Sequence, residues 1–481
     1  MIRHLPPDSP PASGSPAGPP TAPTPPATLR RQVGLGGAVL LGLGSMVGTG
    51  VFVSLGLSAG LVGPWVWLAV LIAGGLALCN GLSSAQLAAA HPVAGGTYEY
   101  AHRVGWPTAG LVAGTLFLLA KSASAATAAL GLAGYVLLRF GQTVGDPLSI
   151  AGGLAAVAML TVVVLEGLRR TNAVNAAVVS VTFLGLAAFV AWGLTDLRAD
   201  HLDPGRWVAA PPAVTATDSG TPTSVPRTHQ VSEDRALGPG TAGTFPIAAL
   251  PGAAALVFVA FTGYGRIATL GEEVLEPRRT IPRAIVTTVV VCVVTYVAVA
   301  VVAVGVVGAG GFAAASEAGA PLESLAVARG WPRPVAWLIT AAALTAMAGV
   351  ILNLLLGLSR VALAMGRRGH LPRLFARVDA SGQTPAPAVL LVAGVVAVLV
   401  GLGSIRAAWS FSAVTVLLYY AITNAAALKL PRAERLYPRA VSWLGLAGCV
   451  GLAAFVEPTY WIAASVAVVG ALLWQRLGRG S

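Results

Sequence analysis

The chain has 481 residues, of which 56% are hydrophobic and only 10% are charged, and its mean hydropathy is +0.78. Soluble proteins carry about 25% charged residues, so this composition excludes soluble domains and predicts an all-α integral membrane protein. The net charge is +12, but the basic residues form short clusters between apolar runs, which argues against a nucleic-acid partner. The three cysteines lie inside apolar runs without metal-binding spacing, and no cofactor is expected.

Residues 1–32 are rich in proline and cannot form the apolar helix of a secretory signal. We therefore predict a disordered cytoplasmic tail there. Residues 33–475 contain twelve apolar runs, and a spanning helix needs about 20 such residues. The runs cover residues 35–58, 62–89, 107–138, 149–166, 174–195, 246–264, 284–308, 334–358, 386–403, 407–428, 440–456 and 458–475.

The arginines between these runs predict an orientation, because Lys and Arg favour the cytoplasmic side of a membrane. With the N-terminus inside, most loop arginines are cytoplasmic, and both termini lie there, including a short tail at 476–481. Residues 196–244, rich in Pro, Gly, Ser and Thr, then form an external polar loop without a fold of its own. We therefore expect a multi-pass protein of the cytoplasmic membrane, with the lipid bilayer as its surroundings.

Two of the runs carry signals for a broken helix. In the first run, glycines at 42, 44, 48 and 50 fall on different faces, so they cannot serve a single packing contact. In the sixth run, Pro251-Gly252 is followed by the segment FVAFTGYGR at 258–266. Non-helical backbone inside a bilayer is tolerated only where it is buried in protein or lines a cavity.

The two predicted breaks are five helices apart. This is the spacing of an inverted repeat of five plus five helices, in which paired broken helices form a substrate site near the membrane midplane. Free N–H groups at a half-helix can bind a carboxylate, and free carbonyls can bind an ammonium group. Such a site suits a zwitterion.

Four motifs resemble the amino acid–polyamine–organocation permease superfamily, especially its bacterial amino acid and cationic amino acid transporter-like members. The segment VGTGVF at 47–52 is similar to the family's Gly-Ser-Gly-Ile-Phe, and PVAGGTYEY at 92–100 matches its Pro-x-Ala-Gly-Gly-x-Tyr-x-Tyr. EEV at 272–274 with PRRTIPR at 277–283, and the turn at 359–372 after the eighth run, are the other two. The resemblance covers about residues 33 to 475.

This resemblance implies a LeuT-like fold with broken helices 1 and 6, and a secondary transporter, not an enzyme, that moves amino acids by alternating access. It implies no obligate protein partner. The matching positions are Gly48, Thr49 and Gly50 for the substrate carboxylate, the carbonyls of Val259, Ala260 and Thr262 for its ammonium group, and Phe258 and Phe261 for a gate over the site.

The sequence departs from the family at positions that bear on coupling. Gly265 stands where the family often has an acid, and Thr182 stands where some proton-coupled members have a helix-five lysine. Lys121 lies about fourteen residues after Pro107, the start of the third run. This position predicts that it is near mid-membrane and faces the central site. A buried amine can bind and release a proton, so we expect proton-coupled or sodium-independent transport that disfavours cationic side chains.

Other functions fit the sequence less well. TGYG at 262–265 resembles part of a potassium-channel filter, but it occurs once among twelve runs. An intramembrane enzyme would need catalytic groups or metal ligands at membrane depth, and none is evident. An exchanger or a non-transporting amino acid sensor on the same fold stays open. Four charged residues predict a cytoplasmic gating network: Glu272, Glu273, Arg278 and Arg279.

Overall fold

The computed structural model of the chain describes seven stretches of the sequence. They are residues 33–91, 95–140, 147–166, 172–206, 247–268, 274–378 and 385–478. The predicted terminal tails, apart from residues 476–478, and most of the predicted external loop lie outside these stretches. Within them the chain forms helices and no strand, with one isolated bridge between Val33 and Val274.

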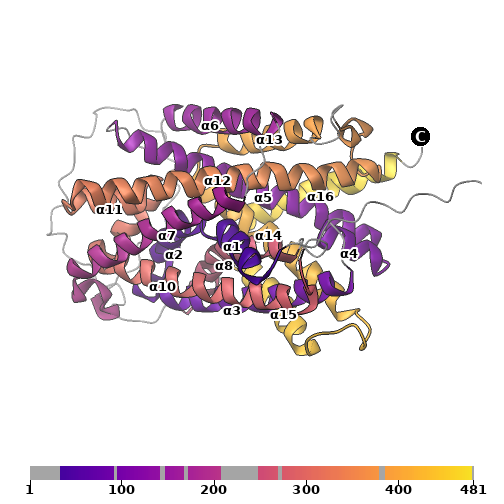
Figure 1. Cartoon of the computed structure of the whole chain (residues 1–481), viewed down its shortest axis with the longest axis horizontal. Helices are drawn as coiled ribbons and strands as arrows, with labels where there is room; N and C mark the ends of the chain where they lie inside the picture. The colour runs from indigo at the N-terminus through magenta and orange to yellow at the C-terminus, as the bar shows by residue number, and fades with distance from the viewer. Residues whose placement is uncertain are drawn as a thin grey trace, which may run out of the picture.

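The helices follow one another along the chain with short connections (Figure 1). In the first half they are α1 (Leu35–Met46), η1 (Gly50–Ser54), α2 (Leu55–Val62), η2 (Gly63–Trp65), α3 (Val66–Ala90), α4 (Thr97–Arg103), α5 (Pro107–Leu138), α6 (Pro147–Leu165), α7 (Asn172–Thr195), η3 (Ala199–Leu202) and η4 (Pro204–Arg206). In the second half they are α8 (Leu250–Phe261), η5 (Thr262–Tyr264), α9 (Gly265–Ala268), α10 (Pro277–Glu317), α11 (Pro321–Ala328), α12 (Arg333–Arg367), η6 (Arg373–Ala376), α13 (Ala386–Gly401), α14 (Ile405–Leu428), α15 (Arg439–Ala453) and α16 (Pro458–Gly478).

Each predicted apolar run coincides with a helix or a pair of consecutive helices. Nine helical stretches of the described chain are long and apolar enough to cross a membrane, and Leu35–Ala90 among them contains two predicted runs. Two further apolar helices, α13 and α15, are shorter. The run predicted to end at residue 308 does so in the structure, because Gly308 leaves helical geometry with φ 75° and ψ 163°.

Close packing around α5 forms the middle of the bundle, and α12, α14 and α6 all pack against this helix. Every residue from Ala120 to Leu130 is buried, and most of them are Ala, Ser, Thr or Gly. Small side chains let membrane helices approach closely and exchange hydrogen bonds. Here the Ser412 hydroxyl on α14 donates to the Ala120 carbonyl on α5 at 2.8 Å. Figure 1 shows α1 and α8 inside the bundle, with α6 and α13 along one edge.

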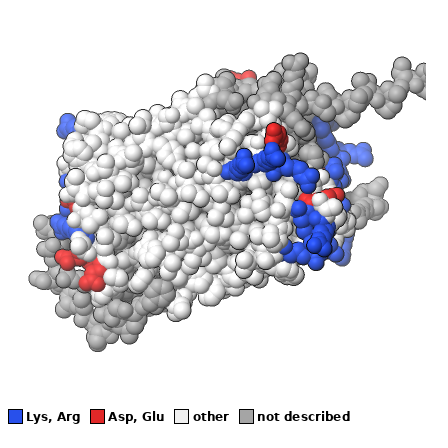
Figure 2. Space-filling model, turned by 60° about the horizontal axis from the view of Figure 1, so that its bottom comes forward, with Lys and Arg blue, Asp and Glu red and all other residues white. Residues whose placement is uncertain are grey.

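The outer surface of the bundle is apolar. Large hydrophobic side chains stand exposed on the peripheral helices, for example Met159 on α6 and Val466 on α16. Figure 2 shows most of the visible charged side chains gathered toward the two ends, with an apolar surface between them. An exposed apolar surface of this extent suits contact with lipid tails and not with water. The chain is a multi-pass membrane protein.

Candidate functional site

The predicted break in the first run is present. Helix α1 ends at Met46, and Val47 is extended with φ −81° and ψ 93°, although its N–H still donates to the Leu43 carbonyl at 2.8 Å. The chain then resumes as the π-helical η1 and continues as α2. The ordinary helical ladder is therefore interrupted around residues 47–49, in the middle of a run that is otherwise apolar.

The sixth run is interrupted as well. Helix α8 ends at Phe261, the tighter 3₁₀ turn η5 covers Thr262 to Tyr264, and the short α9 follows. A 3₁₀ stretch within a longer helix often marks a hinge or a functional site. The sixth run thus changes helix type at the position where the sequence predicted a break.

The two interruptions lie directly against each other. A Cβ atom on Gly263 would stand only 2.3 Å from the Ser45 carbonyl oxygen, and one on Gly50 only 2.2 Å from the Ala260 Cβ. Real Cβ atoms do not approach other atoms so closely. Both glycines are therefore required for contact between the first and sixth runs, which are far apart in sequence.

Two tyrosines from other helices form hydrogen bonds with backbone carbonyls of the interrupted segments. The Tyr296 hydroxyl on α10 lies 2.8 Å from the Met46 carbonyl oxygen and 3.3 Å from the Ala260 carbonyl oxygen. The Tyr420 hydroxyl on α14 donates to the Thr262 carbonyl at 3.3 Å. Tyr296 therefore satisfies backbone carbonyls on both sides of the contact, and Tyr420 satisfies one on η5.

Lys121 reaches the same place from α5, as the sequence predicted. Its ammonium nitrogen donates to the Thr262 hydroxyl at 2.5 Å, and that hydroxyl donates to the Val259 carbonyl at 2.7 Å. Lys121 is only 8% exposed, and no ion pair joins it to an Asp or Glu of the described residues. A buried amine with a hydroxyl as its described partner and no described carboxylate is costly, and such a group inside a membrane is a candidate for function.

The predicted ammonium-binding carbonyls all lie at this place, and each already has a donor within the protein. Val259 accepts from Thr262, Ala260 lies near Tyr296, and Thr262 accepts from Tyr420. The Val259 carbonyl also accepts from the Thr262 N–H, so a ligand's ammonium group would have to replace a donor there, whereas it could share the Ala260 or Thr262 carbonyl through a second lone pair.

The two predicted gate residues are fully buried. Phe258 packs edge-on against Tyr420 with 5.8 Å between ring centroids, and Phe261 packs against Tyr296 at 5.0 Å. Both phenylalanines therefore contact the tyrosines that bind the interrupted backbone, so movement of either ring would disturb those hydrogen bonds.

Thr49 and Tyr264, on the two interrupted segments, both carry a buried hydroxyl with no partner among the described residues, and Thr49 is the one at a predicted carboxylate-binding position. Buried hydroxyls are normally satisfied, so such a group needs an explanation. Gly48 beside Thr49 packs against Val350 of α12, where an added Cβ would lie 2.4 Å from the Val350 Cγ2. Of the three predicted carboxylate-binding residues, Gly48 and Gly50 can offer only backbone groups, whereas Thr49 also offers a side-chain hydroxyl with no partner among the described residues.

The predicted cytoplasmic gating network is only partly within the described chain. Glu272 and Glu273 lie outside it. Arg278 is exposed, and Arg279 lies 3.6 Å from Glu276 in a pair whose side chains are both more than 70% exposed. An exposed pair of this kind contributes about 0–1 kcal/mol.

The charges at the end of the bundle formed by α11 and the start of α12 are paired instead. Arg329 makes two hydrogen bonds of 2.7 Å to the Asp196 carboxylate, and these bonds hold the pKa of Asp196 below its usual value. Glu323 on α11 lies 2.7 Å from Arg139, and its side chain is only 1% exposed. Burial raises the pKa of Glu323 above its usual value.

Sequence reasoning missed Tyr296 and Tyr420. Each lies inside an apolar run, and a buried tyrosine hydroxyl usually finds a hydrogen-bond partner. A tyrosine in the middle of a spanning run therefore predicts that a backbone group without a helical hydrogen bond lies close to it. Which carbonyls they bind depends on contacts between distant segments and cannot be predicted from either run alone.

The sequence is similar to that of known membrane transporters. The family model of the amino acid permeases matches residues 37–479. An uncharacterized transporter of Mycobacterium tuberculosis is 38% identical over 450 residues, covering 92% of this chain and 90% of the relative.

Two more distant relatives carry functional names. The branched-chain amino acid permease of Bacillus subtilis is 25% identical over 374 residues, 74% of this chain and 72% of the relative. The chloroplastic cationic amino acid transporter 9 of Arabidopsis thaliana is 27% identical over 374 residues, 73% and 58% of the two chains. With the family model covering nearly the whole sequence, this chain belongs to the amino acid permease family and is a transporter, not an enzyme.

Proposed function

We propose that this protein moves amino acids across the cytoplasmic membrane by alternating access. The observation that carries the proposal is the direct contact between the two interrupted helices, with Lys121 and Thr49 beside it. Twelve crossings in a five-plus-five inverted repeat, with both termini cytoplasmic, account for the pairing of the first and sixth runs.

The substrate is bound at this contact through its shared zwitterionic groups. The Thr49 hydroxyl and the backbone at Gly48 and Gly50 bind the carboxylate, and the carbonyls of Val259 and Ala260 bind the ammonium group. In support, the buried Thr49 hydroxyl has no partner among the described residues, and Ala260 lies against Gly50 of the first interruption.

Lys121 couples transport to protons and selects against cationic side chains. The Lys121 ammonium group donates to the Thr262 hydroxyl, which in turn donates to the Val259 carbonyl of the proposed site for the substrate's ammonium group. Lys121 has no carboxylate partner among the described residues. A second cation this close to Lys121 would be repelled in a low dielectric. The proposed substrates are therefore neutral amino acids. This choice agrees with the name of the branched-chain relative and not with that of the cationic one.

Uptake into proteoliposomes tests the proposal. We expect saturable uptake of radiolabelled neutral α-amino acids, inhibition by other neutral amino acids, and no inhibition by the corresponding decarboxylated amines. Equal inhibition by an amino acid and its amine would contradict the assignment of a carboxylate site. Step currents in single-channel recordings would contradict a carrier altogether.

Counterflow separates net transport from the two related functions. Proteoliposomes loaded with unlabelled substrate should accumulate label by counterflow, and empty proteoliposomes should accumulate it when an inward proton gradient is imposed. Uptake that requires internal substrate would indicate an exchanger. Binding without either activity would indicate a sensor.

A further inference from the structure

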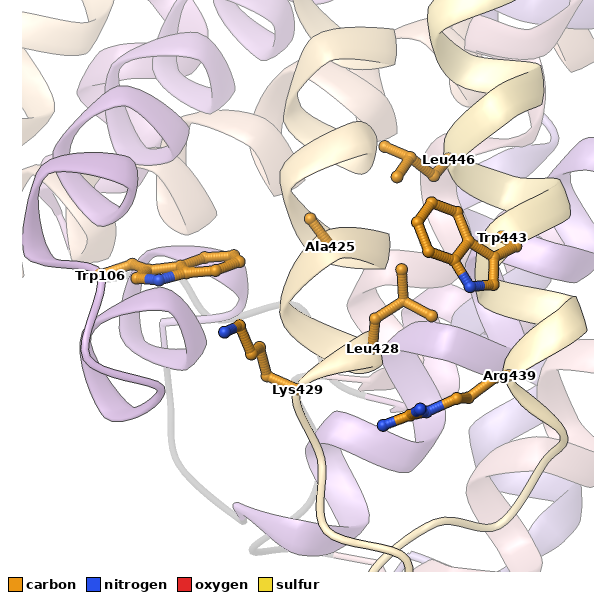
Figure 3. A pocket seen from close by; sticks show the side chains of 7 residues that line it. All are labelled: Trp106, Ala425, Leu428, Lys429, Arg439, Trp443 and Leu446. Atoms are coloured by element: carbon orange, nitrogen blue, oxygen red, sulfur yellow. The ribbon is translucent and has the colours of Figure 1, made fainter.

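An open pocket of about 360 Å³ lies between the ends of three helices, away from the helix interruptions. Trp106 comes from the start of α5, Lys429 follows the end of α14, and Arg439 and Trp443 come from the start of α15. Leu428 and Leu446 supply apolar lining. Figure 3 shows Lys429 below the ring of Trp106, and Arg439 extending beneath Leu428.

The two cations in this pocket have no acidic partner among the described residues. Lys429 faces the Trp106 ring, with its nitrogen 5.2 Å from the ring centroid, and Arg439 makes neither an ion pair nor a hydrogen bond with a residue that the structure describes. Two other exposed arginines of the bundle are paired with carboxylates, Arg368 with Glu99 at 2.6 Å and Arg406 with Glu317 at 2.7 Å. The pocket therefore has uncompensated positive charge.

The pocket lies where apolar spans end. Helix α14 is a candidate span that ends at Leu428, and the apolar helix α15 begins at Arg439. Trp443 is 58% exposed and its neighbour Leu444 is 65% exposed, so an apolar outer surface continues directly from the cations. Tryptophans with Lys or Arg at the edge of an apolar surface are typical of the headgroup region of a bilayer.

We infer that this pocket binds one anionic phospholipid. Lys429 and Arg439 bind the phosphate and the anionic headgroup, while Trp443 and Leu446 contact the start of an acyl chain. Basic pockets between membrane helices recognise anionic headgroups, and Trp rings suit the interface because one end is apolar and the other wet. A free anion has no acyl chain and would leave the exposed apolar surface beside the cations uncovered. The inference does not depend on which substrate is transported.

Native mass spectrometry of the purified, delipidated full chain tests the inference. The probes are phosphatidylglycerol, phosphatidylcholine with the same acyl chains, and inorganic phosphate. We expect phosphatidylglycerol to bind roughly tenfold more tightly than phosphatidylcholine, because each cation near the surface favours an anionic lipid. The double variant Lys429→Gln/Arg439→Gln should lose that preference.

Two variants act as matched controls. Arg432→Gln removes an exposed arginine of the same linker that does not line the pocket, and it should keep the preference. Lys429→Arg keeps the charge and should also keep it. Unchanged lipid preference in the double variant, equal binding of the two lipids by the unmodified protein, or displacement of phosphatidylglycerol by millimolar phosphate would each overturn the inference.

Discussion

Charged side chains have different partners at the centre of the bundle and at the end that carries α11. At the centre, Lys121 is held by the Thr262 hydroxyl, without a described carboxylate, and Thr49 has no partner. At the α11 end, Arg139 and Arg329 are each paired with a carboxylate at 2.7 Å. The described polar groups at the α11 end pair with one another, whereas under the proposed function those at the centre bind the substrate.

This difference predicts how the two regions respond to substitution. Changes at the centre should alter binding, transport or the contact between the interrupted helices. Changes at the end should alter stability and its dependence on pH while transport continues. The predictions below test this division, from the largest expected effect to the smallest.

Gly263→Ala should have the largest effect, because its methyl group would meet the Ser45 backbone at 2.3 Å. Overpacking of this kind costs about 1–3 kcal/mol, and here the opposing atoms are backbone that cannot rotate away. We expect a lower thermal unfolding midpoint in detergent and loss of uptake. Gly357→Ala is the matched control, since a Cβ there meets nothing within 4 Å. Normal uptake by Gly263→Ala would show that the two interruptions need not touch.

Thr49→Val should weaken substrate binding about tenfold without loss of stability. Valine has nearly the same shape, and removing a buried hydroxyl that has no partner leaves no other group unsatisfied. A hydrogen bond to a charged carboxylate contributes about 1.5–3 kcal/mol, which is the binding lost. Isothermal titration with a neutral amino acid measures the change.

Ser45→Ala is the control for Thr49→Val, because the Ser45 hydroxyl already donates to the Leu41 carbonyl at 2.9 Å. It should bind substrate as the unmodified protein does. If Thr49→Val kept full affinity, or if Ser45→Ala weakened binding equally, the carboxylate assignment at Thr49 would be wrong.

Glu323→Gln should have the smallest effect, a change in stability of no more than about 1 kcal/mol with uptake retained, because the lost ion pair is offset by removal of a buried carboxylate whose pKa is raised. Breaking a fully buried pair costs about 3–5 kcal/mol, but the Arg139 side chain is 27% exposed and water can replace part of the interaction. Arg139 also lies 3.8 Å from the Trp337 ring centroid, which keeps it in place. Loss of uptake at unchanged stability would place Glu323 in the transport mechanism instead.

The same variant should change the pH dependence of unfolding. Because burial raises the pKa of Glu323, the folded protein holds this proton more tightly than the unfolded chain does. Its contribution is complete below the usual carboxyl pKa and is lost as pH rises through the raised value. Glu323→Gln should remove that decline. Asp196→Asn should act oppositely, because the lowered pKa of Asp196 gives stability that is lost as pH falls.

Hydropathy predicted the positions of the apolar helices well and their ends less well. The run 107–138 matches α5, but α12 extends to Arg367, beyond the predicted end of its run at residue 358. Apolar runs measure the thickness of the bilayer, whereas a helix continues into water wherever backbone hydrogen bonds and packing allow it. The short helices α4 and α11 lie outside the runs and had no signal of this kind.

Part of the candidate site was also predictable. Glycines on several faces indicated the first interruption, and small neighbours indicated that Lys121 faces inward; the structure has both features. The close packing of Gly48 on Val350 and the hydrogen bonds of Tyr296 and Tyr420 were not predicted. They join segments separated by hundreds of residues, so no local pattern specifies them.

Proton-driven uptake by Lys121 variants tests the central claim most directly. Labelled neutral amino acid is offered to proteoliposomes with and without an inward proton gradient, without sodium. The unmodified protein should accumulate substrate only with the gradient. Lys121→Ala should lose this response, and so should Lys121→Arg, because an arginine keeps its proton at any accessible pH. If either variant retained gradient-driven accumulation at the level of the unmodified protein, Lys121 would not be the coupling residue.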